Sequence, residues 1–217
     1  MRDQFRSIIN DPNGIIILSG TVGSGKSTTL ASALREKDNG ELNIVTAEDP
    51  IEYDLGGNIQ QFPVVRANGQ NFTSLLHTFL RQDPDIVLIG ELRDEETSLS
   101  IFDAAEAGVK IFTTLHASTC AQAFRYLQLI GVPRHQLYMP LLKGILAQKL
   151  VRKVCPICCE EHEINDAESN FIGLKVGTLV RRARALTEEQ KHKGLENNNL
   201  CDRCAGSGYQ GRIAIYE

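Results

Sequence analysis

Ile-Ile-Ile-Leu-Ser-Gly-Thr-Val-Gly-Ser-Gly-Lys-Ser, residues 15–27, is the stretch that decides the fold of this 217-residue chain. Its second part, residues 20–27, fits the phosphate-loop pattern G-x-x-x-x-G-K-[ST]. The aliphatic run before the loop is typical of a buried strand, and residues 26–35 follow a helical pattern. Glycines let backbone N–H groups face phosphate oxygens, and the helix N-terminus adds a favourable dipole. The stretch therefore predicts a nucleotide-binding strand, loop and helix.

The loop supplies the candidates for binding ATP. Lys26 is placed to reach the β- and γ-phosphates, and Ser27 to bind Mg²⁺. The alternative is an ordinary glycine-rich turn, but the strand before the loop and the helix after it favour a nucleotide site. The predicted ATP-binding residues are Gly20, Thr21, Gly23, Ser24, Gly25, Lys26, Ser27 and Thr28.

The pattern around the loop predicts an α/β fold over residues 1–150. Three further short runs rich in β-branched residues indicate buried strands at residues 43–46, 86–89 and 110–113. Amphipathic stretches predict helices at residues 72–80, 95–107 and 121–130. Alternating strands and helices imply a parallel sheet with helices on both faces.

Composition narrows the class of protein. The chain has 27 acidic and 23 basic residues, a net charge of −4, which argues against a nucleic-acid-binding protein. Its longest aliphatic runs fall far short of the roughly 20 residues that span a bilayer. The first ten residues do not form a signal peptide. We therefore expect a cytoplasmic protein with reduced cysteines.

Two acidic groups follow predicted strands. Glu91 comes directly after the strand at residues 86–89, and Glu48 begins a second cluster after the strand ending near Thr46. Ligands bind at the carboxyl ends of parallel strands, so both groups are candidates for chemistry at the phosphates. Glu91 would hold the hydration shell of Mg²⁺ or polarise an attacking water. The alternative for either cluster is a solvated loop.

Two cysteine pairs mark a different region, residues 151–217. Cys155 and Cys158 form one C-x-x-C pair, and Cys201 and Cys204 form the other. Four thiolates in two such pairs suit a tetrahedral structural zinc site, although Cys159 competes with Cys158 for a place in it. A redox pair and a chaperone-type cysteine-rich repeat are weaker alternatives.

The polar stretch between the cysteine pairs, residues 160–199, shows no strong strand pattern. A short helix is expected within residues 179–195, carrying Arg181, Arg182 and Arg184. At the other end of the chain, residues 1–9 are interpreted as the end of a linker.

Four blocks together resemble the ATPase domain of type II secretion and type IV pilus assembly ATPases. In the order of that family they are the Walker A loop at residues 20–27, the Asp box at residues 48–53 with residues 59–61, the Walker B block at residues 81–97 and the His box at residues 113–117. The match resumes at the cysteine pairs. One departure is His77, where the family usually carries an arginine. The chain also has only 19 residues before the phosphate loop and stops just after residues 211–217, so we expect it to be an excised domain.

The resemblance implies a RecA-like P-loop core that works as a hexamer and drives an inner-membrane platform protein from its cytoplasmic side. It implies ATP, Mg²⁺ and Zn²⁺ as cofactors. It also implies that Glu48 is the general base, Glu91 the Walker B acid, His116 a γ-phosphate sensor and Arg81 part of an arginine cluster that reads nucleotide charge.

Other functions remain as alternatives to a motor for pilus assembly or secretion. They are a nucleic-acid-translocating P-loop ATPase, a small-molecule kinase, and a zinc-stabilised interaction module with a decayed nucleotide site. The net charge and the lack of an aromatic-basic groove weigh against the first. The positions of Glu91 and His116 favour water activation over transfer to an acceptor. The intact Lys26, Ser27, Glu48 and Glu91 weigh against decay.

Overall fold

The computed structural model describes residues 2–184, 186–196 and 200–217. It divides into two compact units, the first comprising Met1–Lys149 with Ala214–Glu217 and the second Leu150–Ile213. The end of the chain joins the first unit because Glu217 and Ala147 exchange backbone hydrogen bonds of 2.9 and 3.1 Å.

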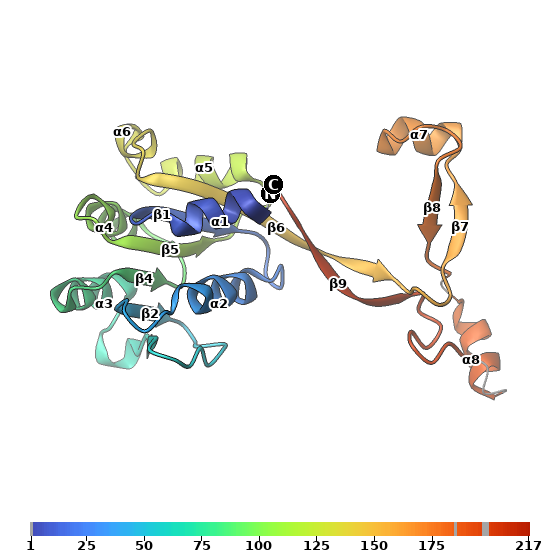
Figure 1. Cartoon of the computed structure of the whole chain (residues 1–217), viewed down its shortest axis with the longest axis horizontal. Coiled ribbons are helices and arrows are strands. Elements are labelled where there is room, and N and C mark those ends of the chain that lie inside the picture. The colour runs from blue at the N-terminus through green and yellow to red at the C-terminus, as the bar shows by residue number, and fades with distance from the viewer. Residues whose placement is uncertain (1, 185, 197–199) are drawn as a thin grey trace. The chain divides into compact units, whose positions relative to one another are not determined.

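The first unit is built on a seven-stranded sheet in the order β3-β2-β4-β5-β1-β6-β9 (Figure 1), of which residues 150–154 of β6 and 209–213 of β9 belong to the second unit. Parallel pairing joins β1 to β5 and β6, β2 to β3 and β4, and β4 to β5. Their carboxyl ends therefore meet at one edge of the sheet, as the sequence predicts. The strands are β1 (Gly14–Ser19), β2 (Ile44–Glu48), β3 (Gln60–Pro63), β4 (Ile86–Ile89), β5 (Lys110–Leu115), β6 (Leu142–Val154) and β9 (Tyr209–Tyr216).

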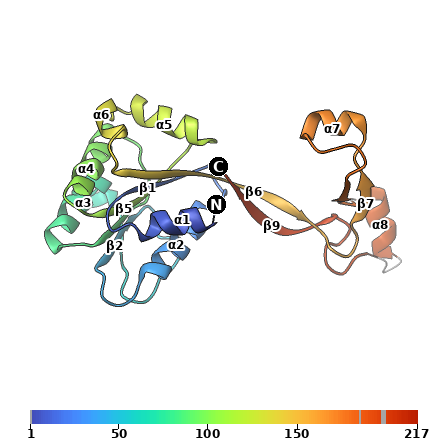
Figure 2. The ribbon, with the colours of Figure 1, turned by 45° about the horizontal axis from the view of Figure 1, so that its top comes forward.

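Helices cover both faces of this sheet, which confirms the predicted α/β class (Figure 2). Those of this unit are α1 (Arg2–Asn10), α2 (Lys26–Lys37), α3 (Phe72–Phe79), α4 (Glu95–Glu106), α5 (Cys120–Leu129) and α6 (Arg134–Leu137), with 3₁₀ turns η1 (Arg66–Asn68) and η2 (Leu80–Gln82). Successive residues of β1 alternate between the two faces, because strand side chains point to opposite sides. Ile17 packs with α3 and α4 on one face, and Ile16 packs with α2 on the other.

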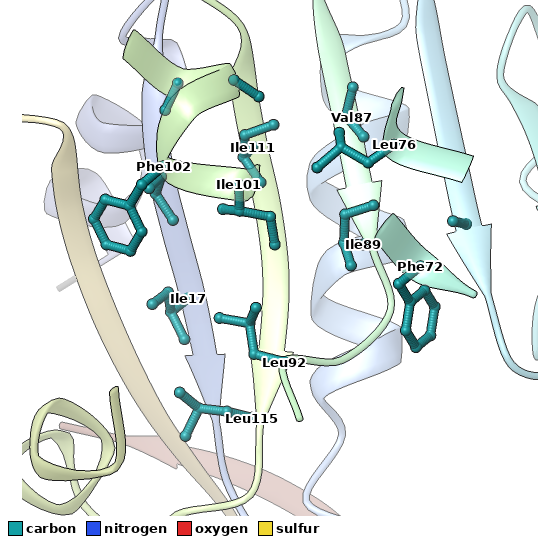
Figure 3. Close-up of a cluster of buried hydrophobic side chains, with 14 of the residues drawn as sticks. Ile17, Phe72, Leu76, Val87, Ile89, Leu92, Ile101, Phe102, Ile111 and Leu115 are labelled. Atoms are coloured by element: carbon teal, nitrogen blue, oxygen red, sulfur yellow. The ribbon is translucent and has the colours of Figure 1, made fainter. Parts of the chain in front are cut away.

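The larger core lies between the sheet and helices α3, α4 and α5. Figure 3 shows Ile89 of β4, Ile111 of β5, Leu76 of α3 and Phe102 of α4 in this cluster. All four residues are 0% exposed. Such close packing makes the strands a rigid support for the loops at their carboxyl ends.

Residues 2–10 form helix α1, so the interpretation of this segment as a linker end was wrong. Ile9 is buried in the smaller core, among residues of α2 and the sheet. The ammonium of the buried Lys110 donates to the backbone oxygens of Ile8 (3.0 Å) and Asp11 (2.5 Å). Buried apolar contact and satisfied carbonyls both hold the C-terminal end of α1 on this unit.

The second unit contains a β-hairpin that the sequence analysis missed. Strands β7 (Glu160–Glu163) and β8 (Leu179–Arg182) pair antiparallel, and α7 (Asp166–Ile172) lies between them in the chain. The expectation that Arg181 and Arg182 lie on a helix was wrong, since both belong to β8. The helix of this stretch is α8 (Glu188–Glu196), which begins after Arg184. Residues 185 and 197–199 lie outside the described residues.

Within the described part of the chain, no helix has the length and apolar character needed to cross a membrane.

Candidate functional site

The predicted phosphate loop connects β1 to α2 at the edge where the parallel strands end. Gly25, the N-cap residue of α2, has a positive φ of 89°, a conformation that favours glycine. At Gly20 a Cβ would lie 2.5 Å from the backbone oxygen of Gln148 and 2.4 Å from Ser24 Oγ. These glycines are therefore required by the backbone path, which turns the loop around the start of α2.

Lys26 is the buried cation of the loop. Its Nζ donates to the backbone oxygens of Gly20 (2.7 Å) and Thr21 (3.2 Å). Burial lowers the pKa of Lys26, while the charges of Glu91 and Glu52 act in the opposite direction. The ammonium thus lies inside the loop, where the charge of Glu91 acts on it.

Gln148 of β6 supports the loop from the neighbouring strand. Its Nε2 donates to Ser24 O (2.8 Å), and its Oε1 accepts from Thr29 Oγ1 (2.8 Å). The side chain is 2% exposed, so both bonds form away from water. The hydroxyl of Ser24 is also buried and has no partner among the described residues. A buried hydroxyl of this kind suits a phosphate oxygen as its acceptor.

Glu91 and His116 meet beside the loop. His116 follows β5, the strand between β1 and β4, and its two ring nitrogens face opposite partners. Nε2 lies 3.2 Å from Glu91 Oε1, and Nδ1 lies 3.3 Å from Gly20 O. The other Glu91 oxygen accepts from Arg93 Nε (2.6 Å), and this bond is the main cause that raises the pKa of Arg93. His116 therefore connects the phosphate loop to the carboxylate of Glu91.

Glu48 ends β2, the strand beside β4, at the same edge of the sheet. Its Oε1 accepts from Thr46 Oγ1 (2.7 Å) and from Gln61 Nε2 (2.9 Å). The loop that follows reaches the phosphate-loop helix, where Tyr53 and Thr28 hydroxyls lie 2.9 Å apart. The structure thus places both predicted acids and the loop on one edge.

Arg81 does not join this group. It lies exposed in η2, which precedes β4, whereas Glu91 follows the same strand. Asn43, just before β2, donates from Nδ2 to Gln82 O (2.8 Å), which fixes η2 at the edge where the strands begin. Within one chain Arg81 is therefore at the opposite edge from the phosphate loop.

The second unit brings the predicted four cysteines together. The Sγ atoms of Cys155, Cys158, Cys201 and Cys204 all lie within 4.8 Å of one another. Two of these separations are 3.9 Å (Cys155 to Cys201) and 3.3 Å (Cys158 to Cys204). Four thiolates around zinc, with bonds of about 2.3 Å, would lie about 3.8 Å apart. The cluster fits such an ion, whereas Cys159 Sγ instead donates to Pro156 O (3.7 Å).

The two thiols of the first pair differ: the backbone around Cys155 favours its thiolate, whereas the hydrogen bond with Cys204 raises the pKa of the Cys158 thiol to about 12. Backbone hydrogen bonds from Cys158 and Ile157 are the main causes that lower the pKa of the Cys155 thiol. Thiolate is the form that binds metals. The geometry therefore supports metal binding in this unit.

Sequence reasoning missed the supporting amides and hydroxyls. Gln148 lies 124 residues from its partner Ser24, and Gln61 lies 13 residues from Glu48. The only sequence signal available was the position of Gln61 just after the acidic cluster, in the block that resembles the Asp box.

Comparison with known proteins places the whole chain in one family. The family model for Type II/IV secretion system protein matches residues 1–217. The chain is 41% identical over 216 residues to Type II secretion system protein E of Dickeya dadantii (strain 3937), covering 100% of this chain and 40% of that protein. It is 38% identical over 215 residues to the type IV pilus assembly ATPase PilB of Thermus thermophilus, covering 99% of this chain and 23% of that protein.

Solved structures agree with these relatives. The pilus retraction motor PilT with bound ADP superposes with a TM-score of 0.64 at 31% identity, over 72% of this chain and 48% of that chain. The ATPase DotB of Legionella pneumophila superposes with a TM-score of 0.63 at 30% identity, over 71% of this chain and 45% of that chain. The resemblance seen in the sequence motifs is confirmed, and the chain belongs to the Type II/IV secretion system protein family.

Proposed function

We propose that this chain binds and hydrolyses ATP, and that it is part of a motor that assembles a type IV pilus or a type II secretion pseudopilus. The observation that carries the proposal is His116, which contacts both Gly20 of the phosphate loop (3.3 Å) and Glu91 (3.2 Å). A group in this position responds to whatever occupies the loop and passes the response to the acid beside it. The relatives named as a type II secretion system protein and a type IV pilus assembly ATPase support the same function.

The phosphate loop would hold the triphosphate. Lys26 donates to two loop carbonyls, and phosphate oxygens would compete with them for its ammonium. Ser27 would bind Mg²⁺, which neutralises charge on the β- and γ-phosphates when bound. The hydroxyl of Ser24, which has no partner among the described residues, and the backbone N–H groups at the start of α2 would complete the donor set.

The two acids differ in a way that supports their different roles. Both oxygens of Glu91 are engaged, one by His116 and one by Arg93. Among the described residues, both donors to Glu48, which are Thr46 and Gln61, reach Oε1. A general base needs an oxygen free to accept a proton from water. We therefore assign the base to Glu48 and the Mg²⁺-shell acid to Glu91.

The position of Arg81 supports action between subunits. Arg81 lies exposed at the edge opposite the phosphate loop, so within a hexamer it would read the nucleotide of a neighbouring copy. The assembly would lie in the cytoplasm against the inner membrane and drive a platform protein there. The relatives cited here are named for secretion and pili, and nothing favours a nucleic acid as partner.

The cysteine cluster would hold one structural Zn²⁺. Cys155, Cys158, Cys201 and Cys204 supply four sulfur ligands and leave no open position for a water. When bound, the ion supplies folding free energy rather than catalysis.

Lys26→Ala tests the nucleotide site. Removal of the buried ammonium should abolish ATP hydrolysis in the full chain and weaken ATP binding by more than about 100-fold, because the charge that meets the phosphates is lost. Binding of a fluorescent ATP analogue and phosphate release measure the two effects. Lys37→Ala, an exchange in the last turn of the same helix, is the control. Parental turnover in the Lys26 variant would remove the assignment of this loop.

ATP turnover measured against protein concentration tests whether subunits act together. Activity that rises steeply with protein concentration would support a site completed between subunits.

A further inference from the structure

The side-chain amide of Gln61 forms three hydrogen bonds beside the proposed base, two from its nitrogen and one to its oxygen. Gln61 lies in β3, where its backbone pairs with Thr46 of β2. Its Nε2 donates to Glu48 Oε1 (2.9 Å) and to Tyr53 O (2.9 Å), and its Oε1 accepts from Leu55 N (2.8 Å). One side chain thus joins the carboxylate to two points of the loop that follows it.

The two donors to Glu48 leave its carboxylate asymmetric. Thr46 Oγ1, from a fully buried residue of β2, donates to Oε1 at 2.7 Å, the same oxygen that Gln61 reaches. Among the residues that the structure describes, none donates to Oε2. A carboxylate held through one oxygen has a fixed orientation and keeps the lone pairs of the other oxygen for a proton.

We propose that Gln61 is a positioning residue for ATP hydrolysis: it holds Oε1 of Glu48 so that Oε2 is presented to the attacking water. This inference rests on the proposed function, in which Glu48 is the general base. Gln61 itself does not contact nucleotide in this account and acts through Glu48.

The hydrogen bond from Gln61 to Tyr53 connects Glu48 to the helix that follows the phosphate loop. Tyr53, whose backbone oxygen accepts from Gln61, has its hydroxyl 2.9 Å from that of Thr28 on α2. Arg35 of the same helix donates to Asp54 O (2.6 Å) and Leu55 O (3.2 Å). The loop to which Gln61 is hydrogen-bonded is therefore also hydrogen-bonded to the helix that begins at Lys26. These bonds would fix the position of the base relative to phosphates in the loop.

Gln61→Met is the central variant, because it keeps the length of the side chain and removes its donors and acceptor. The neighbouring Gln60→Met is the matched control, since Gln60 is an exposed residue of the same strand. We expect kcat to fall roughly 10-fold or more in the Gln61 variant, because a misplaced base loses its near-attack geometry. The KM for ATP and the affinity for a non-hydrolysable analogue should stay within about 2-fold of the parent. A parental kcat, or a loss of affinity equal to the loss of kcat, would overturn the proposal.

A second pair of variants guards against misfolding of the loop. Thr46→Val removes the other donor to Oε1 without touching residues 53–55, whereas Thr46→Ser keeps the hydroxyl. The valine variant should lower kcat and the serine variant should restore most of it. Equal activity in both would show that the donors to Oε1 do not matter.

A double-mutant cycle with Glu48→Gln separates this inference from the proposed function. If Gln61 acts through the carboxylate, Gln61→Met should reduce kcat little further once Glu48 is replaced. An additive further loss would assign Gln61 a different, merely structural role. If Glu48→Gln alone hydrolyses ATP at the parental rate, the base assignment fails and the inference fails with it. If Glu48→Gln is impaired but Gln61→Met is not, only the inference fails.

Discussion

The two compact units of this chain differ in what stabilises the fold of each. In the first unit, each face of the sheet carries a continuous cluster of buried aliphatic and aromatic side chains. In the second, Leu150–Ile213, the buried residues among those described are Cys155, Ile164, Cys204, Gly206 and Gly208. Two of these five are proposed zinc ligands and two have no side chain. Apolar burial therefore accounts for the first fold and not for the second.

This difference explains why the candidate nucleotide site lies in the first unit and the candidate metal site in the second. Close packing under β1, β4 and β5 holds three loops in register, so groups distant in sequence meet at one edge. The second unit needs an external constraint, and four sulfurs within 4.8 Å offer one. Structural zinc contributes on the order of 10 kcal/mol in small peptides, enough to replace a missing core.

The largest effect that would sharpen the comparison is expected from Cys155→Ser. Loss of one ligand should abolish stoichiometric Zn²⁺ binding and unfold Leu150–Ile213, because few apolar contacts remain to hold it. Metal content and limited proteolysis measure this. Cys159→Ser is the matched control, since Cys159 lies outside the cluster and should keep one Zn²⁺ per chain. A Cys155 variant that retains the metal and resists protease like the parent would show that the module has another source of stability.

A smaller effect, on the rate of ATP hydrolysis, is expected from replacing the two acids at the sheet edge of the first unit. Glu48→Gln should slow hydrolysis by roughly 100-fold or more while ATP still binds, because a base is lost and shape is kept. Glu91→Gln should in addition raise the Mg²⁺ concentration needed for activity. Titration of Mg²⁺ in both variants measures the difference. Normal hydrolysis by the Glu48 variant, together with failure of the Glu91 variant, would reverse the two roles.

The smallest predicted effect tests the buried polar support of the first unit. Burial lowers the pKa of Lys110 from 10.5 to about 8, against the charge of Asp11. Between these values the unfolded lysine holds a proton that the folded one releases, so the free energy of unfolding should rise with pH. The rise from pH 8 to pH 10 should be roughly 2 kcal/mol and absent in Lys110→Met. Urea denaturation at the two pH values measures it, and an equal slope in parent and variant would contradict this account.

The sequence predicted the elements whose burial leaves a pattern. Strands β1, β4 and β5 are short β-branched runs, and α3 and α4 are amphipathic, so both classes were located to within a few residues. The phosphate loop, Glu48, Glu91 and His116 became candidates because each follows a predicted strand. Their shared edge then follows from parallel pairing.

The missed features lack such a pattern. The hairpin of β7 and β8 pairs Glu160–Glu163 with Leu179–Arg182, and most of these side chains are exposed, so neither strand shows a buried face. Gln61 and Gln148 act through contacts that join separate segments, which a single sequence does not reveal. Arg81 was placed in the site by resemblance, whereas the order of η2 and β4 puts it at the opposite edge of this chain.

Amide hydrogen exchange before and after metal chelation reports on the stability of both units in one sample. We expect chelation to expose the amides of Leu150–Ile213 to rapid exchange while β1, β4 and β5 keep their protection. Unchanged exchange in the second unit of a fully chelated, metal-free protein would contradict the claim that a metal holds it. Equal loss of protection in both units would contradict the claim that the first is held by its own packed core.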